Sequence, residues 1–422
     1  MDALSTILRG GTRHAGPMAV GPHWCISVLA STANSPSVLR FALNQRSRAA
    51  RLHLLSPKVK ESERMNINNR RIWQVAAGDG ERAYHDLLIE WDVIAIGPGE
   101  FGPWPDCEAD VVEARTRNQG TIIRRFAEQM AIGDLIILRK GSSNVCAVGE
   151  VASDYLWLDD FGDIDGWDLQ HVRRVRWIWK YKDIPTNLGA NVLRFGDSVQ
   201  DACSAELQQW IEKLDIGKNA SSRKLVTLPE SCQHGVRRPQ VSLEQLTEGL
   251  FDLGIGLSDA NTVVDRMREL EMLSGWYKRA KDKPAENETV AYLVVPLLRA
   301  LGWTPQRMAV EWKNIDLALF SRLPRTDANL AAVLEGKAMN KACLIAKEQG
   351  ESYVQAAERS HCERLIVTEG IRYAVFRKHS NSFTVHPAAY INLIRRLPDY
   401  PILRSAGSIE AIALLAADWR SE

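Results

Sequence analysis

The amino-acid sequence predicts a multi-domain α/β protein. Its 422 residues exceed the roughly 100–200 that one domain usually takes, which predicts two or three domains. Two stretches alternate short strand patterns with helical patterns, and a polar segment rich in Ser, Gly, Pro and Arg separates them over 216–242. We therefore expect four regions: an N-terminal extension over 1–64, an α/β domain over 65–215, a linker with a helical segment over 216–282, and a second α/β domain over 283–422.

The charge balance and the cysteine pattern exclude several classes of protein. The chain carries 53 Lys and Arg against 52 Asp and Glu, so it is not histone-like and any nucleic-acid surface must be a local patch. No run of about 18 apolar residues occurs, so we expect no membrane span. The seven Cys are scattered without a C-x-x-C pair, which indicates a reducing cytoplasmic location rather than a disulfide framework or a zinc site.

The N-terminal extension differs from the rest of the chain. It is rich in Ser, Ala and Arg and has almost no carboxylates between Asp2 and Glu61. One interpretation is a disordered arm. The other, which we favour, is that translation begins at Met65, because the sequence from that residue leads straight into a strand pattern.

Short apolar runs bounded by Gly, Pro and polar turns predict the elements of the first α/β domain. We expect strands over 72–76, 93–96, 135–138, 145–151 and 172–180, and helices over 83–89, 122–130 and 207–214. The strands over 135–138 and 145–151 should pair around a polar turn that contains Gly141. These elements predict a mixed α/β domain.

The remaining elements follow the linker. Helices are expected over 243–253 and 261–280, on either side of a turn with two glycines. From Glu286 onward the order is helix, strand, strand, helix, strand, and a last helix is expected over 408–419 after Gly407. This order predicts a compact second α/β domain.

Four charged residues in apolar surroundings mark a candidate catalytic site in that domain. At helical spacing Glu286 shares a stripe with Val290 and other apolar residues, so its carboxylate should aim toward the core. Asp316 interrupts an apolar strand, while Glu335 and Lys337 are two residues apart in the next one and so project to one face. Charges inside apolar strands are not typical of a solvated surface.

These residue types suit phosphodiester hydrolysis. Two carboxylates on neighbouring strands, Asp316 and Glu335, can hold Mg²⁺ (or Mn²⁺), which prefers oxygen ligands and keeps several waters. The ion polarises the phosphodiester and activates water, and Lys337 orients that water and offsets transition-state charge. Glu286 could join the outer shell of the ion. Alone, a pattern of this kind is more often an exposed ion pair.

Residues 284–378 resemble the PD-(D/E)xK nuclease domain found at the N-terminus of type I restriction motor subunits. That family opens with Glu-x-x-Thr and an apolar run to Pro-Leu-Leu-x-x-Leu-Gly-Trp, matched here by Glu286, Thr289 and residues 296–303. The resemblance implies an α/β/α fold of the restriction-endonuclease type and Mg²⁺-dependent cleavage of DNA. No G-x-x-x-x-G-K-[ST] motif follows, so the motor of those relatives is not expected.

The same resemblance assigns individual roles. It places the metal-binding Asp of the family on Asp316, its E-x-K motif on Glu335 and Lys337, and its Gln-x-x-x-Tyr helix on Gln349 and Tyr353. Gln349 therefore joins the candidate catalytic residues. The family's Thr-Asn-Gly turn departs from the pattern, because Glu369 stands at its middle position.

Tryptophan is concentrated in the first α/β domain and suggests a base-binding cleft. Trp104 lies in a Pro-flanked loop, and Trp157 and Trp167 flank an acidic loop, where burial is hard to arrange. Such rings can stack on a base swung out of a helix. Basic residues that could contact the nucleic-acid backbone lie nearby: Arg117, Arg174 and Arg176. The alternatives are core tryptophans and a solvated basic edge strand.

Residues 71–187 resemble the PUA-like YTH/EVE group of modified-base readers. The segments 133–138 and 145–151 follow that group's core pattern, and 167–187 is similar to the end of YTH domains. The resemblance implies a PUA-like barrel in which Trp167 is one cage wall, Trp104 or Trp157 is another, and residues 76–79, with Ala77, Gly78 and Asp79, line the pocket. Ile94 stands where a cage Trp is usual, so selectivity for N6-methyladenine does not carry over.

Taken together, these patterns predict a modification-dependent, type IV-like DNA endonuclease that defends against foreign DNA. It would bind double-stranded DNA carrying a modified base, cut with Mg²⁺, and act as a homodimer, because a double-strand cut needs two active sites; the segment 243–280 is the candidate dimer contact. Two alternatives stay open: a non-catalytic reader of modified DNA or RNA, and an RNA-directed nuclease.

Overall fold

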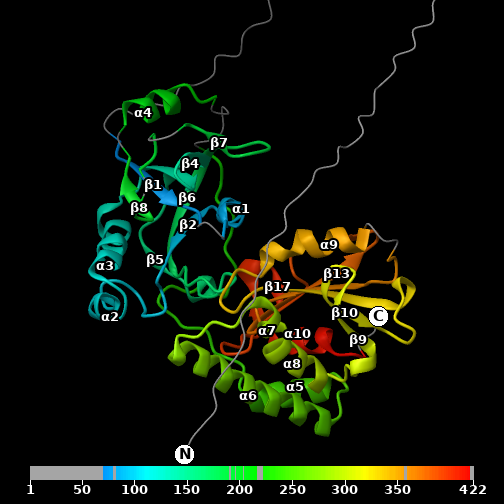
Figure 1. The fold of residues 1–422 in the computed structure, drawn as a ribbon. Helices are drawn as coiled ribbons and strands as arrows, with labels where there is room; N and C mark the ends of the chain where they lie inside the picture. The colour runs from blue at the N-terminus through cyan, green and yellow to red at the C-terminus, as the bar shows by residue number, and fades with distance from the viewer. Residues whose placement is uncertain are drawn as a thin grey trace, which may run out of the picture. The chain divides into compact units, whose positions relative to one another are not determined.

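The computed structural model describes residues 70–78, 82–189, 192–194, 196–202, 204–215, 222–355 and 359–418, all within one compact unit, Lys60–Glu422. The chain is mixed α/β and multi-domain, with two separate sheets (Figure 1). The N-terminal extension, the predicted start at Met65, and Asp79 lie outside the described residues. None of the described helices is both long and apolar enough to cross a membrane.

The first sheet curls into a half-barrel with the strand order β2-β6-β4-β3-β1-β8. Two short strands flank this path, since β5 pairs with β6 and β7 pairs with β4. The strands β1 and β3 are parallel, and the other pairs are antiparallel. The strand bounds are β1 (Ile72–Ala76), β2 (Val93–Ile96), β3 (Leu135–Lys140), β4 (Asn144–Val151), β5 (Leu156–Trp157), β6 (His171–Lys180), β7 (Thr186–Asn187) and β8 (Val199–Asp201). All five strands expected from the sequence are therefore confirmed, within one to two residues at their ends.

Helices cover both faces of this sheet. They are α1 (His85–Glu90), α2 (Glu108–Ala114), α3 (Arg117–Arg124) with a π-helical turn over Arg125–Gln129, a 3-10 turn over Asp159–Phe161, and α4 (Ala205–Glu212). Leu207 and Ile211 of α4 share a helical face and pack against Leu135 and Ile137 of β3. The opposite face of the sheet holds a larger core that includes Phe126 and Phe161.

The polar segment predicted as a linker is packed against the first sheet over its described part. The backbone N–H of Val226 donates to Asp92 Oδ2 (2.9 Å), and the N–H of Gly235 donates to the carbonyl of Trp157 (3.0 Å). Asp92 is fully buried and also pairs with Arg223. A buried carboxylate needs such partners, so this segment is part of the fold rather than a loose tether.

Two helices follow, α5 (Leu243–Asp252) and α6 (Leu257–Ala280), as the sequence predicts. Ser242 begins α5 with a capping box, in which its hydroxyl accepts from the N–H of Gln245 and the Gln245 side chain accepts from the N–H of Ser242. The apolar stripe that includes Leu246 and Met267 packs into the core of the second sheet. The helical segment therefore covers the second sheet.

A long first helix opens the second α/β domain. It runs through α7 (Glu286–Thr289), a π-helical turn over Val290–Val294, and α8 (Val295–Ala300). Pro296 has no N–H and its ring clashes with the preceding turn, so a regular α-helix cannot pass through it. The π turn directly before Pro296 accommodates this break.

The second sheet has the order β16-β17-β15-β13-β12-β11-β10-β9, with β14 beside β13. Most neighbours are antiparallel, but β11 and β12 are parallel, as are β15 and β17. The bounds are β9 (Met308–Trp312), β10 (Ile315–Phe320), β11 (Leu330–Gly336), β12 (Arg364–Thr368), β13 (Arg372–His379), β14 (Ser382–Phe383), β15 (Ala389–Asn392), β16 (Asp399–Tyr400) and β17 (Ser405–Ala406).

Helices lie on both faces of the second sheet (Figure 1). One face carries α9 (Lys347–Gln355), and the other carries α5, α6, α8 and α10 (Ser408–Leu415). The apolar alternation of the strands divides between these layers. This arrangement decides which side of β10 and β11 carries the candidate catalytic residues.

Candidate functional site

The candidate catalytic carboxylates lie on the α9 face of the second sheet. Leu317 and Leu334 are partners across the antiparallel β10–β11 pair, and both pack toward α5, α6, α8 and α10. Extending this register by one residue sets Asp316 opposite Glu335, and both then point to the other face. The structure therefore brings together the two carboxylates that the sequence selected.

Glu335 is fully buried, yet neither of its carboxylate oxygens has a hydrogen-bond partner among the described residues. Burial and, to a smaller extent, the neighbouring charge of Asp316 raise the pKa of this carboxyl to about 8, although Lys337 opposes the rise. Gly350 of α9 lies directly over the side chain, because a Cβ there would be 3.2 Å from Glu335 Cγ and 2.4 Å from Leu365 Cδ1. A glycine thus lets α9 approach the carboxylate closely.

The other members of the site are only partly exposed. Asp316 is half-buried, and its Oδ2 accepts from the backbone N–H of Gly336 (2.7 Å). Lys337 Nζ lies 3.5 Å from Glu286 Oε1. The sequence-based expectation that Glu286 aims into the core is wrong: it is the first residue of α7, and its side chain stays 46% exposed. At a helix start a carboxylate faces the free N–H groups rather than the core stripe.

Gln349 lies near this cluster but at the surface. It directly precedes Gly350 in α9, is exposed, and its Nε2 donates to the hydroxyl of Tyr353 (3.1 Å). The expectation that Gln349 and Tyr353 share a helical face is confirmed.

The donor set fits a divalent cation held by few protein ligands. No group of three or more His, Cys, Asp and Glu side chains in the described ranges could hold a metal ion. Mg²⁺ does not require such a group, because it binds through one or two carboxylates and retains waters. The unpaired buried oxygens of Glu335 beside Asp316 are the observation that favours a bound cation.

We predict that metal binding at this site strengthens as the pH rises through about 8. Because burial raises the pKa of Glu335 to about 8, this carboxyl is protonated at neutral pH and must lose a proton to ligate a cation. Calorimetric titration of Mn²⁺ at pH 7 in buffers of different ionisation enthalpy should show proton release on binding. The Glu335→Gln variant is the control, and equal proton release by that variant would contradict the prediction.

The raised pKa of Glu335 also makes the stability of the fold depend on pH. The pKa of Glu335 is raised in the folded state, so its contribution favours folding fully below its ordinary pKa and is lost as pH rises through about 8. A bound cation opposes this loss, since it binds the ionised form.

A cavity of about 830 Å³ opens in the first domain. Its walls come from the ends of β1, β2 and β3 and from the loops before β6 and β8, and the lining includes Gly78, Pro98, Arg139, Trp167, Asp168 and Ser198. This volume falls in the range of small-molecule sites. The sequence placed Trp167 and Gly78 in a base pocket, and the structure brings both of them to this cavity.

Trp167 is held on its other sides by two residues. Tyr84 contacts it edge-on, with ring centroids 5.6 Å apart, and the guanidinium of Arg82 lies 5.7 Å from the centroid of the indole ring. The indole is half-buried. It is therefore a fixed ring that borders the cavity.

The structure does not bring Trp104 or Trp157 to the cavity. Trp104 is 6% exposed and its indole N–H donates to Glu128 (2.7 Å), while Trp157 is 1% exposed and donates to the carbonyl of Gly99 (2.9 Å). The loops that carry them fold back onto the core and satisfy both indole N–H groups, so these rings are structural. The expectation of a second cage wall from either ring is not met.

Ala77 also lies away from the cavity. It is buried, its N–H donates to the carbonyl of Arg139 (2.8 Å), and its carbonyl accepts from Tyr84 (2.9 Å). Both of its backbone groups are thus used within the fold and cannot read a base.

The expected phosphate-binding arginines of β6 are engaged by the linker. Arg174 donates to the carbonyls of Val226 and Asp92, and Arg176 donates to the carbonyl of Arg223 (3.3 Å). Their basic face is therefore covered by the segment that was expected to be loose. Arg117 is exposed at the start of α3 and stays a candidate backbone contact.

Arg139 and Asp168 also line the cavity, although they were not among the site residues expected from the sequence. Burial and a hydrogen bond with Glu100 together raise the pKa of Asp168 to about 7. A carboxyl with this pKa is partly protonated at neutral pH, and its protonated form can both donate and accept a hydrogen bond. In the sequence, Arg139 is marked by its place directly after the apolar run 135–138, and Asp168 by its place directly after Trp167.

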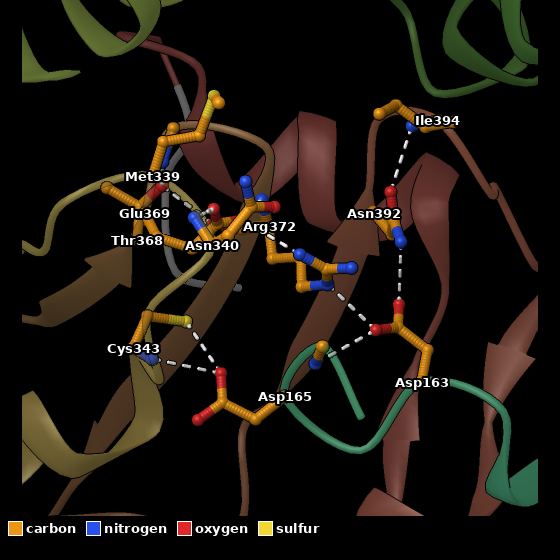
Figure 2. A network of polar contacts seen from close by, with 12 residues as sticks. Asp163, Asp165, Met339, Asn340, Cys343, Thr368, Glu369, Arg372, Asn392 and Ile394 are labelled. Carbon is orange, nitrogen blue, oxygen red and sulfur yellow. Dashed lines mark hydrogen bonds and ion pairs between the residues drawn. The ribbon is translucent and has the colours of Figure 1, made fainter. Parts of the chain in front are cut away.

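A network of buried polar residues joins the wall of this cavity to the second sheet (Figure 2). Asp163 Oδ1 accepts from the N–H of Gly166, next to Trp167, and from Arg372 Nε at 2.8 Å. Its other oxygen accepts from Asn392 Nδ2 (2.9 Å). The loop that carries Trp167 is thus fixed by β13 and β15.

The network continues to Thr368, whose carbonyl contacts Lys337 of the candidate catalytic cluster. Arg372 pairs with the fully buried Glu369 (3.2 Å), which also accepts from the N–H of Asn340 (2.6 Å). Thr368, the neighbour of Glu369, accepts from the N–H of Lys337 (2.8 Å). Hydrogen bonds and two peptide steps therefore connect Trp167 with Lys337.

A second carboxylate of the same loop reinforces this contact. Asp165 is fully buried and accepts from the N–H of Cys343 (3.0 Å), the N–H of Leu344 (3.1 Å) and the hydroxyl of Tyr84 (3.2 Å). Tyr84 is also the edge contact of Trp167. The acidic loop is therefore buried and contacts residues of the second domain.

Comparison with known proteins gives one match. The profile of a family described as a domain of unknown function (DUF8426) matches residues 73–193, which include most of the residues that line the cavity. No curated protein matches the chain. The function must therefore be argued from the two sites themselves.

Proposed function

We propose that this chain is an endonuclease that cuts DNA carrying a modified base, with Mg²⁺ (or Mn²⁺) as its cofactor. The cavity of the first domain would receive the base, and the cluster of Asp316, Glu335 and Lys337 would hydrolyse the phosphodiester. The observation that carries the proposal is the buried, unpartnered carboxylate of Glu335 beside Asp316 and close to an ammonium group. Defence against foreign DNA is the role such specificity would serve.

Each residue of the cluster has a defined task in this proposal. When bound, the cation supplies Lewis acidity to the phosphodiester and lowers the pKa of a water. Asp316 and Glu335 would hold it, and Lys337 would orient the attacking water and offset the charge that develops on the phosphoryl oxygens. Glu286 supports Lys337 through their contact at 3.5 Å. The resemblance to PD-(D/E)xK domains supports the same roles.

The cavity supports recognition of a base removed from the helix. Trp167 offers an aromatic surface, and base stacking on such a ring contributes about 1–3 kcal/mol. The polar network supports a link between reading and cutting, because it connects the loop of Trp167 with the backbone at Lys337. The PUA-like resemblance agrees with this division of work.

A homodimer is part of the proposal, since a double-strand cut requires two active sites. The exposed apolar residues Met272 and Trp276 on α6 support the helical segment as the contact, being 68% and 50% exposed. Sedimentation of the protein with cleavable DNA should then show a two-chain complex.

Incubation of the protein with DNAs that carry different methyl, hydroxymethyl or glucosyl bases, with and without Mg²⁺, tests the proposal. We expect cleavage of at least one modified DNA only when Mg²⁺ is present. Trp167→Ala should lower affinity for that DNA about 10-fold or more, the loss of one stacking contact. Ile184→Ala, at an exposed apolar residue that is not part of the cavity lining, is the binding control.

Three outcomes would redirect the proposal. Binding of modified DNA without cleavage under any divalent cation would favour a non-catalytic reader. Cleavage of RNA but not DNA would favour an RNA-directed nuclease. Equal cleavage of unmodified DNA would remove the role of the modified base.

A further inference from the structure

The cavity of the first domain is lined by a buried guanidinium, that of Arg139, which has no part in base stacking on Trp167. Arg139 ends the apolar run of β3, lines the cavity and is 5% exposed. Its Nη1 donates to the carbonyl of Gly141 (2.6 Å) and its Nη2 to the carbonyl of Asp197 (3.0 Å). Both acceptors are neutral backbone groups.

Most of the donor capacity of Arg139 is unused. A guanidinium carries five N–H donors, and only two hydrogen bonds engage them here. Nε has no partner within the described part of the chain. Burial lowers the pKa of Arg139, and no carboxylate among the residues that the structure describes acts against this effect. An uncompensated buried charge is costly, so the site favours an anionic ligand.

Arg115 provides the contrast within the same cavity. It also lines the cavity but is exposed and forms an ion pair with Glu100. Its charge is already neutralised by the protein, whereas that of Arg139 is not.

The position of Arg139 suits the phosphate of a nucleotide whose base contacts Trp167. Trp167 lies in the loop before β6, beside the end of β2. Arg139 is the next-to-last residue of β3, which pairs with β1 elsewhere in the strand order. The cavity volume of about 830 Å³ lies toward the upper end of the range for small-molecule sites, which suits a nucleotide better than a lone base. Gly141 and Gly196 place bare backbone next to Arg139, so a bulky anion can approach.

We propose that this cavity binds a whole nucleotide, with the base on Trp167 and a phosphate on Arg139. This inference rests on the proposed function in that its ligand is a nucleotide. The nucleotide can be part of a DNA strand or free in solution, and both sources share the same chemistry.

Titration of the full chain with free deoxynucleosides and their 5′-monophosphates tests the phosphate contact. We expect each monophosphate to bind at least about 10-fold more tightly than its nucleoside, the factor of one charge-assisted hydrogen bond. Arg139→Gln should bring this ratio to about 1, Arg115→Gln should preserve it, and Trp167→Ala should weaken both ligands while preserving the ratio. Thermal unfolding of each variant confirms that it folds, and Arg139→Lys, which keeps the charge, should retain part of the ratio.

A second arm uses DNA that carries a modified base with either a normal or a neutral methylphosphonate linkage beside it. We expect the neutral linkage to weaken binding to the unchanged protein but not to Arg139→Gln. A phosphate-dependent ratio with free nucleotides, but no binding of modified DNA, would retain this inference and refute the proposed function. Binding of modified DNA that ignores both the linkage and Arg139 would overturn the inference and leave the proposed function standing. The absence of binding in both arms would overturn both.

Discussion

Replacement of Glu335 by Gln should lower the rate of DNA cleavage by about 10³-fold or more, while affinity for modified DNA stays within about twofold. The amide keeps the size of the side chain but cannot supply the negative charge that a cation needs. The side chain is fully buried and its oxygens have no partners in the described structure, so the substitution breaks no hydrogen bond. Single-turnover cleavage and equilibrium binding, measured on the same DNA, separate the two effects.

Matched variants sharpen this test. Glu348→Gln changes an exposed carboxylate of α9 and should leave the cleavage rate unchanged. Asp316→Asn keeps an acceptor for the N–H of Gly336, and Lys337→Met keeps the apolar stem, so both should fold. Each should lose cleavage in the same way as Glu335→Gln. Substantial cleavage by Glu335→Gln would disprove the catalytic assignment.

Strands of both sheets could be predicted where each is a short apolar run with clear ends. Val93–Ile96 is followed by Gly97 and Pro98, and the predicted and observed bounds of β2 are identical. The period of two along β10 and β11 also put Asp316 and Glu335 on faces that could meet. Local pattern and tertiary structure agree here, because the apolar neighbours of each carboxylate are core residues on the opposite face.

The acidic loop shows where a local pattern fails. The sequence predicts an acidic loop between Trp157 and Trp167, and its residues Asp159, Asp163 and Asp165 are all buried. Their partners lie far along the chain: Arg372 is 209 residues from Asp163, and Arg395 is 236 residues from Asp159. Spacing within the loop contains no information about such pairs.

Glu369 gives a second example. The resemblance expects Asn between Thr368 and Gly370, and the substitution looked like a weakness of the match. In the structure, the longer side chain reaches both the N–H of Asn340 and Arg372. The departure from the family pattern is therefore explained by the contact between the two sheets' loops, which no single-sequence motif encodes.

The expectation that Arg174 and Arg176 of β6 form an open basic face failed for a related reason. Alternation along the strand correctly gives Arg174 and Arg176 a common face, but it does not say what covers that face. Carbonyls of the 222–241 segment occupy it. A polar composition suggested a free linker, although polar backbone can equally be held by buried charges such as Asp92.

Replacement of Arg372 by Met should lower the free energy of unfolding by about 3–5 kcal/mol at pH 7. Asp163 and Glu369 hold the pKa of Arg372 above its usual value although burial opposes the charge, and the side chain is only 17% exposed. Without the guanidinium, two buried carboxylates lose their counter-charge. Urea unfolding gives the difference, and Arg299→Met, at an exposed arginine of α8, should change it by less than about 0.5 kcal/mol.

The pH dependence identifies the cause of this loss. Burial raises the pKa of Glu369, so protonation of this carboxyl removes one of the unpaired charges, and the deficit of Arg372→Met should shrink as the pH falls from 7 toward 4. Asp163→Asn added to Arg372→Met removes one of the two charges and should recover part of the stability at pH 7. A deficit as small as that of Arg299→Met, or one independent of pH, would show that the buried ion pairs do not fix the Trp167 loop to the second sheet. The path from Trp167 to Lys337 would then lose its two central steps, which join Asp163 to Arg372 and Arg372 to Glu369.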